Sequence, residues 1–409
     1  MCSMHVESGK ARKEPGDAGR GVDRRALIAG GVVLAAGIGA GVGALARGSG
    51  SEPAAAAAPP PPSTGPALPF HGPRQSGVTA PQQPATQLLA FDLAPAAVSD
   101  GRAALRSLLG ALTRLLAEAT AGTSADPRLR GGEDARLSSL VALGPALTGR
   151  LGLNAPAGLA ELPAFPGDRL DPARGGGDLV LQLCAADRWP VSVLAEQVAA
   201  AVAAKGGTLR WTQSGFLPRT APGTTPRNLF GYKDGTANPD EETAKQWVWG
   251  PAGGPYEHGT VLVYRRIRMD TAAFAALAED RRDQAMGRRI GDGAPLTGAA
   301  EHDDPDIYAK NPDGSYVIPA GAHVRLSSPR LDGGARILRR GYSYDDGAGD
   351  RGLLFCAFMR DPGQFTRIQN RLAAKDALNP FLEHNGSAVA YVLPGVAAEG
   401  GALGESLWG

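Results

Sequence analysis

Three polar side chains stand out because each lies in a segment whose local pattern does not require it. Asp234 lies between a lysine and a glycine in the turn-forming stretch GYKDGTANP (231–239). His323 separates the stretches VIPAGA and VRLSSPR, and Arg339 is the first arginine of ILRRGYSYDDG. On local grounds Arg339 and Arg340 could instead pair with the two aspartates of that stretch. A carboxylate, an imidazole and a guanidinium together can move a proton, ligate a metal and stabilise developing negative charge.

The remaining histidines offer no second metal ligand. The chain has six histidines and contains no HExxH pattern, no Walker-type loop and no GxSxG elbow, so zinc or triad hydrolysis has no support. By itself His323 would equally suit a buried or loop histidine. A lone histidine with a carboxylate and an arginine suits peroxide activation at a haem iron, in which the histidine ligates one face of the iron. The remaining histidines are expected in the N-terminal lead (His5) or in surface loops (His71, His258, His302 and His384).

Charge and cysteine content exclude some classes of protein. The 409 residues include 42 basic and 41 acidic side chains, so a general grip on nucleic acid, which needs many phosphate contacts, is not indicated. Cys184 and Cys356 lie in apolar runs and are expected to be small buried hydrophobic residues, although a disulfide between neighbouring strands stays open. Cys2 lies in the N-terminal lead.

The N-terminus has the pattern of an export signal. A charged lead ends in Arg24 and Arg25, and an apolar Gly/Ala-rich stretch follows over 26–46, ending in ALA as a cleavage candidate. We therefore expect residues 1–50 to engage the twin-arginine export machinery, with the protein secreted or associated with the outer side of a membrane. An uncleaved membrane anchor is the alternative. Residues 51–69, rich in proline and alanine, are expected to form an extended tether.

The rest of the chain divides into two halves, 70–250 and 251–409, with the same order of elements. The apolar patterns predict strand–helix–insertion–strand–helix–strand in each. In the first half, strands are expected at 88–93, 178–186 and 208–216 and helices at 99–120 and 190–204. In the second, strands are expected at 259–269, 352–360 and 387–394 and helices at 271–280 and 362–374, around an insertion over 281–350. This order predicts an α+β fold of two ferredoxin-like halves, each an antiparallel sheet with helices on one face.

Several motifs resemble one family throughout. RNLFGYKDGTANP contains the GxxDG motif of the dye-decolourising peroxidases, in the exported bacterial branch that includes the deferrochelatase/peroxidase group. The stretches GVTAPQQ, LPAFPGDRLDPARGGGDLVLQLCAAD, GAPLTG, AHVRLSSPR and ILRRGYSYDDG are similar to segments of that family, in order, over about 70–400. The resemblance implies the dimeric α+β barrel type of fold, with one haem b per chain held between the halves.

The same resemblance implies roles for individual residues. His323 is expected to be the proximal iron ligand, Asp234 the distal acid–base group, and Arg339 the distal arginine. A haem-ligating histidine commonly gives its other N–H to a carboxylate. Asp376 is the first candidate for that carboxylate and Glu383 the second. The segments expected to line the haem and its propionates are the backbone at Gly235, Thr236 and Ala237, and Arg330.

The family's activity is the reduction of hydrogen peroxide coupled to oxidation of bulky electron donors such as dyes or phenols, through a ferryl intermediate. An exported haem- or iron-handling role, similar to a deferrochelatase, is the alternative. Because a dye is larger than a peroxide-sized cavity, the aromatic side chains Trp247, Trp249, Tyr342 and Tyr344 are candidate electron relays, or else ordinary core residues. The sequence leaves a monomer and a homodimer equally open.

Overall fold

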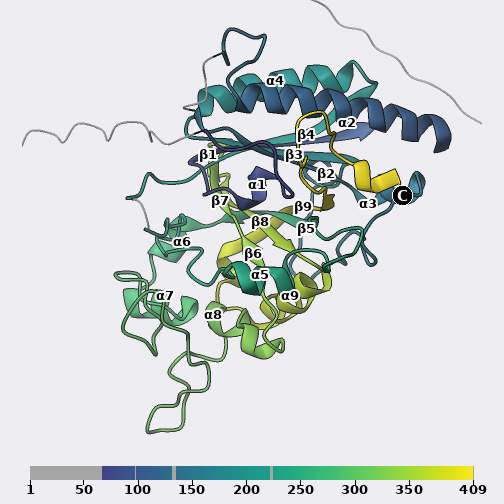
Figure 1. The fold of residues 1–409 in the computed structure, drawn as a ribbon. Helices are drawn as coiled ribbons and strands as arrows, with labels where there is room; N and C mark the ends of the chain where they lie inside the picture. The colour runs from purple at the N-terminus through teal and green to yellow at the C-terminus, as the bar shows by residue number, and fades with distance from the viewer. Residues whose placement is uncertain (1–66, 97, 131–134, 222–223, 409) are drawn as a thin grey trace, which may run out of the picture. The chain divides into compact units, whose positions relative to one another are not determined.

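The strands of the protein form one antiparallel sheet that closes into a barrel (Figure 1). The computed structural model describes residues 67–96, 98–130, 135–221 and 224–408. Around the barrel the order is β5-β9-β2-β3-β1-β4-β7-β8, and pairing of β8 with β5 completes the circle. The strands are β1 (Ala85–Leu93), β2 (Ser138–Leu143), β3 (Leu179–Ala185), β4 (Gly207–Phe216), β5 (Thr260–Met269), β6 (Leu338–Arg339), β7 (Tyr342–Asp345), β8 (Arg351–Met359) and β9 (Leu382–Val392).

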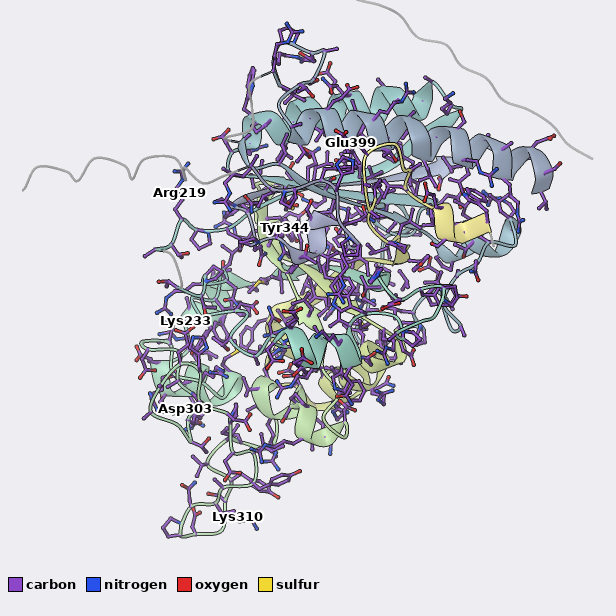
Figure 2. The ribbon with its side chains drawn as sticks, viewed as in Figure 1. Arg219, Lys233, Asp303, Lys310, Tyr344 and Glu399 are labelled. Atoms are coloured by element: carbon purple, nitrogen blue, oxygen red, sulfur yellow. The ribbon has the colours of Figure 1, made fainter. Side chains whose placement is uncertain are left out.

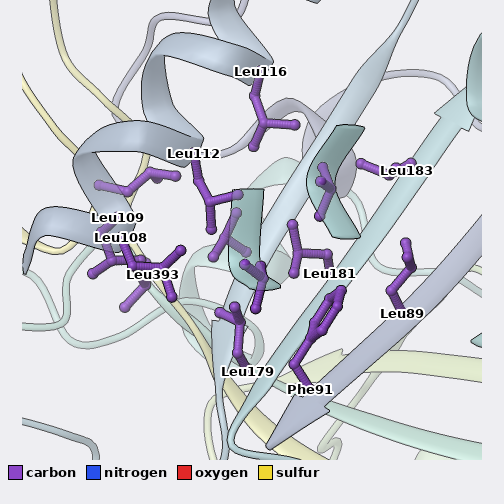
Figure 3. Packing of buried hydrophobic residues seen from close by; sticks show 14 of the residues in the cluster. Leu89, Phe91, Leu108, Leu109, Leu112, Leu116, Leu179, Leu181, Leu183 and Leu393 are labelled. Carbon is purple, nitrogen blue, oxygen red and sulfur yellow. The ribbon is translucent and has the colours of Figure 1, made fainter. Parts of the chain in front are cut away.

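Two long helices cover the outer face of the first-half strands: α2 (Val98–Thr120) and α4 (Arg188–Ala203), which lie side by side (Figure 1). Leu105, Leu108, Leu109, Leu112 and Leu116 of α2 recur every three or four residues, so they share one helical face. Figure 3 shows this face packed against leucines of β3 and Phe91 of β1. The shorter helices of this half are α1 (Ser76–Thr79), α3 (Pro145–Arg150) and α5 (Glu241–Trp247), which follows the GYKDG turn.

The second-half strands are covered on their outer face by α9 (Gly363–Lys375). Along β5 the side chains alternate, so Leu262 and Tyr264 face the barrel interior while Val261 and Val263 face outward toward Phe365 of α9. The other helices of this half are α6 (Thr271–Ala275), α7 (Glu279–Met286) and α8 (His323–Leu326).

The barrel interior is a packed core. Leu88, Leu140, Trp211 and Phe358 belong to one buried cluster drawn from both halves, and Trp211 stacks on Tyr264 at 5.0 Å between ring centres. Pairing of β2 with β9 and of β4 with β7 joins the halves around this core. Because side chains fill the barrel, a cofactor of this protein must bind outside it.

The strands β6 and β7 run along the same edge of β8 as one interrupted strand. Arg339 pairs with Ala357, and the pairing resumes with Tyr342 opposite Leu354 after a break at Arg340 and Gly341. Arg340 keeps the same register, because its N–H donates to the Cys356 carbonyl at 2.8 Å. Successive side chains of a strand point to opposite faces, so Arg339 and Arg340 leave it in opposite directions and only one of them can reach the site described below.

The predicted fold class is confirmed, with differences of detail. The strand β2 was not expected, and the region 281–350 contains α8, β6 and β7 as well as the long loops that carry Asp303 and Lys310 (Figure 2). Asp270 caps α6 as its sequence suggests, accepting a hydrogen bond from the Ala273 N–H at 2.9 Å. Ser99 and Asp100 lie within the first turn of α2, which begins one residue earlier than predicted.

Several other expectations can be placed. Cys184 and Cys356 are free and buried, so no disulfide joins them. Trp249, Tyr342 and Tyr344 are buried in the barrel core, while Trp247 is partly exposed. The predicted export signal and nearly all of the tether lie outside the described residues. Within the part of the chain that is described, no helix has both the length and the apolar character that crossing a membrane requires.

Candidate active site

The GYKDG turn holds Asp234 in a fixed position. Gly231 and Gly235 have φ angles of +88° and +119°, conformations that residues with a Cβ rarely adopt. The Asp234 N–H donates to the Pro226 carbonyl at 2.9 Å, and the Arg227 guanidinium donates to the Gly231 carbonyl at 2.6 Å. The two glycines are therefore required by the backbone conformation of the turn that carries Asp234.

Arg339 of β6 lies beside that carboxylate. Its Nη1 is 3.4 Å from Asp234 Oδ1, and both side chains are partly exposed. The side chain of Asn238 binds the Arg339 backbone twice, accepting from its N–H at 2.9 Å and donating to its carbonyl at 2.8 Å. The loop that carries Asp234 is thus fastened to the strand that carries Arg339.

The alternative pairing of the two arginines with nearby aspartates does not occur. Asp345 pairs with Arg351, and Asp346 pairs with Arg266. Arg340 turns into the protein, where its Nη1 donates to the Ala80 carbonyl at 2.7 Å.

His323 begins α8 and is oriented by a carboxylate. Its Nδ1 is 2.6 Å from Oδ2 of the buried Asp376, and Asp376 Oδ1 accepts from the Leu378 N–H at 2.9 Å. Burial disfavours charge on the imidazole, but Asp376 outweighs that effect and raises the pKa of His323. Glu383, the second candidate, lies elsewhere and pairs with Arg169 and Arg268. Of the two carboxylates, the structure brings Asp376 to His323.

Both pairs line a single cavity of about 220 Å³ on the outer side of the barrel. Asp234, Arg339, His323 and Asp376 all contribute to its wall. Much of the rest of the wall is apolar, which suits a flat hydrophobic ligand with few polar anchors. These apolar side chains include Ile267, Met286, Leu353, Phe355, Ile368 and Leu372.

The other predicted binding residues divide into two groups. Thr236 and Ala237 line the main cavity, and Gly235 lines a smaller adjoining pocket together with Asp234 and Arg339. Arg330 forms an ion pair with Asp304 and is not among the described residues that line either pocket.

Besides Arg339, the cations in the cavity wall are Lys233, Arg265, Arg288 and Arg336, none of which was predicted; Arg288 and Arg336 come from the second-half insertion. Arg288 is buried, and burial together with the charge of Arg339 lowers its pKa. No motif identifies Arg288 and Arg336, because they come from the long second-half insertion and only the fold brings them to the cavity.

His384 departs from the expectation of a surface or loop histidine. It lies on β9 and lines the cavity, because a bulge between Arg266 and Ile267 pairs His384 with Ile267 and turns it toward the outer face. Its Nδ1 accepts from Nε of the buried Arg265 at 3.4 Å, and Arg265 also pairs with Asp168. Burial and the Arg265 charge lower the pKa of His384 to about 4.

The cavity suits a haem. His323 has Nδ1 engaged by Asp376, so its Nε2 remains for an iron atom; no hydrogen bond to that nitrogen occurs within the described chain. In the same residues no cluster of three or more His, Cys, Asp and Glu side chains could hold a bare metal ion. A single imidazole ligand is sufficient for an iron that a porphyrin already holds. Apolar walls with arginines among them suit a macrocycle that carries carboxylates.

Comparison with known proteins agrees with this site. The family models for the N-terminal and C-terminal parts of Dyp-type peroxidases match residues 75–217 and 225–397. A dye-decolorizing peroxidase from Thermobifida fusca is 37% identical, covering 81% of this chain and 83% of the relative. A deferrochelatase from Yersinia pestis is 35% identical, covering 83% and 84%. The crystal structure of a DyP-type peroxidase from Streptomyces coelicolor, 34% identical, superposes with a TM-score of 0.78, covering 86% and 100%. The chain therefore belongs to the Dyp-type peroxidases, haem-binding oxidoreductases.

Proposed function

We propose that this protein uses hydrogen peroxide to oxidise organic electron donors such as dyes or phenols at a haem b held by His323. The observation that supports this most directly is the composition of one cavity wall. It contains the Asp234–Arg339 pair, which can act on peroxide, and the His323–Asp376 pair, which can hold an iron. A haem bound there would supply the iron that peroxide oxidises by two electrons.

Asp234 and Arg339 have different roles in the reaction with peroxide: one transfers a proton and the other stabilises negative charge. With a haem in place, the Asp234 carboxylate would accept a proton from one oxygen of peroxide and return it to the other oxygen, which would leave as water. The Arg339 guanidinium, 3.4 Å from Asp234 Oδ1, stabilises the negative charge that develops as the O–O bond breaks. Because Asn238 holds the backbone of Arg339, both groups keep their positions before peroxide arrives.

The Asp376 carboxylate fixes the His323 ring and makes Nε2 a more electron-rich ligand, because the N–H at Nδ1 is held by a negative charge.

The experiment is an optical titration of the purified protein with haemin, followed by hydrogen peroxide and an anthraquinone dye. We expect a Soret band from a one-to-one complex, a rapid spectral change with peroxide, and loss of the dye colour. A protein that binds no haemin, or whose haemin complex leaves the dye unchanged with peroxide, would contradict the proposal.

A role in haem or iron handling is the second candidate, supported by relatives named deferrochelatase at 35% identity over most of the chain. The same His323 cavity would serve, with haem as the substrate. Release of iron with an intact porphyrin, faster than oxidation of any dye, would favour this role.

We also propose export by the twin-arginine route, supported by Arg24 and Arg25 ahead of a Gly/Ala-rich apolar stretch. Replacing both arginines by lysine should keep the protein inside the cell that makes it, measured by fractionation. Unchanged export of the double variant would refute this.

A further inference from the structure

Tyr232, the residue two positions before Asp234, is a buried tyrosine in the cavity wall. It is 1% exposed, and its ring meets that of Phe274 edge-on at 6.3 Å between centres. It lines the same cavity as Asp234 and His323. A phenol is a one-electron donor, and this one is placed in the wall of the compartment where peroxide reacts.

The Tyr232 hydroxyl has a carboxylate partner. Its Oη donates to Asp283 Oδ1 of α7 at 2.6 Å, and the same oxygen accepts from the Ile290 N–H at 3.0 Å. Burial and the hydrogen bond to Asp283 raise the pKa of Tyr232 above its ordinary value. The phenol therefore stays protonated at all working pH values, and an electron can leave it readily only if the proton leaves with it.

We propose that Tyr232 is a redox-active tyrosine that gives one electron to the peroxide-oxidised cofactor and its proton to Asp283. The O–H bond of the phenol breaks, and a new O–H bond forms on the Asp283 carboxylate. The cofactor is reduced by one electron, and a neutral tyrosyl radical and a carboxylic acid remain. A reducing substrate then supplies one electron to the radical while Asp283 returns the proton. This inference rests on the proposed peroxidase function.

Another buried tyrosine provides a matched comparison. Tyr344 also donates to a carboxylate, Asp350 Oδ1, at 3.1 Å. It faces the barrel core with the Arg266 guanidinium 3.9 Å from its ring centre, and it is not among the described residues that line the cavity. Figure 2 shows Tyr344 near the sheet and Lys233, the neighbour of Tyr232, at the level of α6 and α7. The positive charge beside Tyr344 also opposes loss of an electron from its ring.

The test is electron paramagnetic resonance of the full chain loaded with haemin and frozen shortly after mixing with hydrogen peroxide. We expect a tyrosyl signal that is lost in Tyr232→Phe and retained in Tyr344→Phe. In Asp283→Asn the signal should also be lost, because an amide cannot take up the proton. The Soret band of each variant shows that haemin is bound.

The outcomes separate this inference from the proposed function. Consumption of peroxide without a tyrosyl signal, or with a signal that survives in Tyr232→Phe, overturns the role of Tyr232 alone. A full signal in Asp283→Asn overturns the assigned proton acceptor. A haemin complex that does not react with peroxide overturns the proposed function and this inference with it.

Discussion

At the scale of single residues, the site consists of two pairs of side chains. In one, Asp234 is the proposed proton acceptor and Arg339 is the cation beside it; in the other, His323 is the proposed iron ligand and Asp376 is the carboxylate that orients it. Asp234 and Arg339 lie 3.4 Å apart, and His323 and Asp376 lie 2.6 Å apart. Each pair joins residues more than 50 positions apart in the sequence, so local patterns could suggest the members but not their contact.

The clearest residue-scale prediction concerns Asp234→Asn. Removing the proton acceptor should slow the reaction with peroxide by about 10²- to 10⁴-fold. Stopped-flow absorbance of the haemin-loaded protein measures this rate. Asp345→Asn is the matched control, because Asp345 forms a 3.3 Å ion pair with Arg351 and is not among the described residues lining the cavity. Equal rates for the two variants would remove Asp234 from the mechanism.

Asp376→Asn should weaken haem binding or activity by about 10- to 100-fold, because the partner that orients His323 is lost. Haemin titration followed at the Soret band measures the affinity. Glu383→Gln, which removes the other candidate carboxylate, should bind haemin as the unaltered protein does. A larger loss of haemin affinity in Glu383→Gln than in Asp376→Asn would show that Glu383, and not Asp376, supports the iron ligand.

His384 makes stability depend on pH. Its pKa of about 4 in the folded protein lies below the value of about 6.5 expected for an unfolded chain. Between pH 4 and pH 6.5 the unfolded state binds more protons than the folded state. The depressed pKa therefore adds about 3 kcal/mol to the free energy of unfolding above pH 6.5, and this stabilisation is lost as the pH falls through 4. In urea unfolding, His384→Gln should therefore lose less stability than the unaltered protein between pH 7 and pH 4.5. Parallel loss in both proteins would contradict a depressed pKa.

At the scale of elements, the site depends on the contact between the GYKDG loop and β6. Neither element is long, and Arg339 is the last residue of a two-residue strand. Asn238 connects them by binding the Arg339 backbone on both its N–H and its carbonyl. Because successive side chains of a strand alternate between its two faces, Arg340 points away, and of the two arginines only Arg339 reaches Asp234.

Asn238→Ala should slow the reaction with peroxide by up to about 100-fold, because small misplacement of a reacting group carries costs of that order. Haem binding should persist, since His323 and α8 are untouched. Stopped-flow kinetics and a haemin titration measure the two effects. Asn311→Ala, which removes a hydrogen bond in an exposed loop, is the control and should be neutral. A normal rate in Asn238→Ala would show that the contact does not position Arg339.

Elements with a clear period were predictable and the others were not. The leucines of α2 and the apolar runs of β3, β5 and β8 locate those elements within a few residues. The strands β2 and β3 are both buried at every position, but β2 (SSLVAL) begins with two serines and leaves only a four-residue apolar run, which is too short to identify a strand. His384 was misjudged for another reason, because a bulge in β9, invisible in the sequence, decides which face it takes.

At the scale of the whole molecule, the packed core that stabilises the barrel and the cavity that carries the candidate site lie in different places. The barrel interior is filled by side chains from both halves. The cavity lies outside, between the GYKDG loop of the first half and strands and helices of the second half. The fold class and the residues Asp234, His323 and Arg339 could be predicted because specific motifs carry them. Arg265, Arg288 and Arg336 could not, because nothing in their local sequence marks them and only the closed fold brings them to the cavity.

The cores and the cavity all belong to residues of the compact unit Pro60–Gly409. A variant that begins at Pro60 should therefore fold and bind haemin with the affinity of the full chain. Circular dichroism and a haemin titration check this. Loss of folding in the shortened chain would show that the first 59 residues contribute to stability.

The most direct test of the central claim is a crystal structure of the haem-loaded protein. We expect the iron to be coordinated by Nε2 of His323, with Asp376 on the other ring nitrogen. Asp234 and Arg339 should lie together over the opposite face of the haem, within hydrogen-bonding reach of a ligand on the iron. An iron bound to any other residue, or a haem with Asp234 and Arg339 on the same face as His323, would contradict the account.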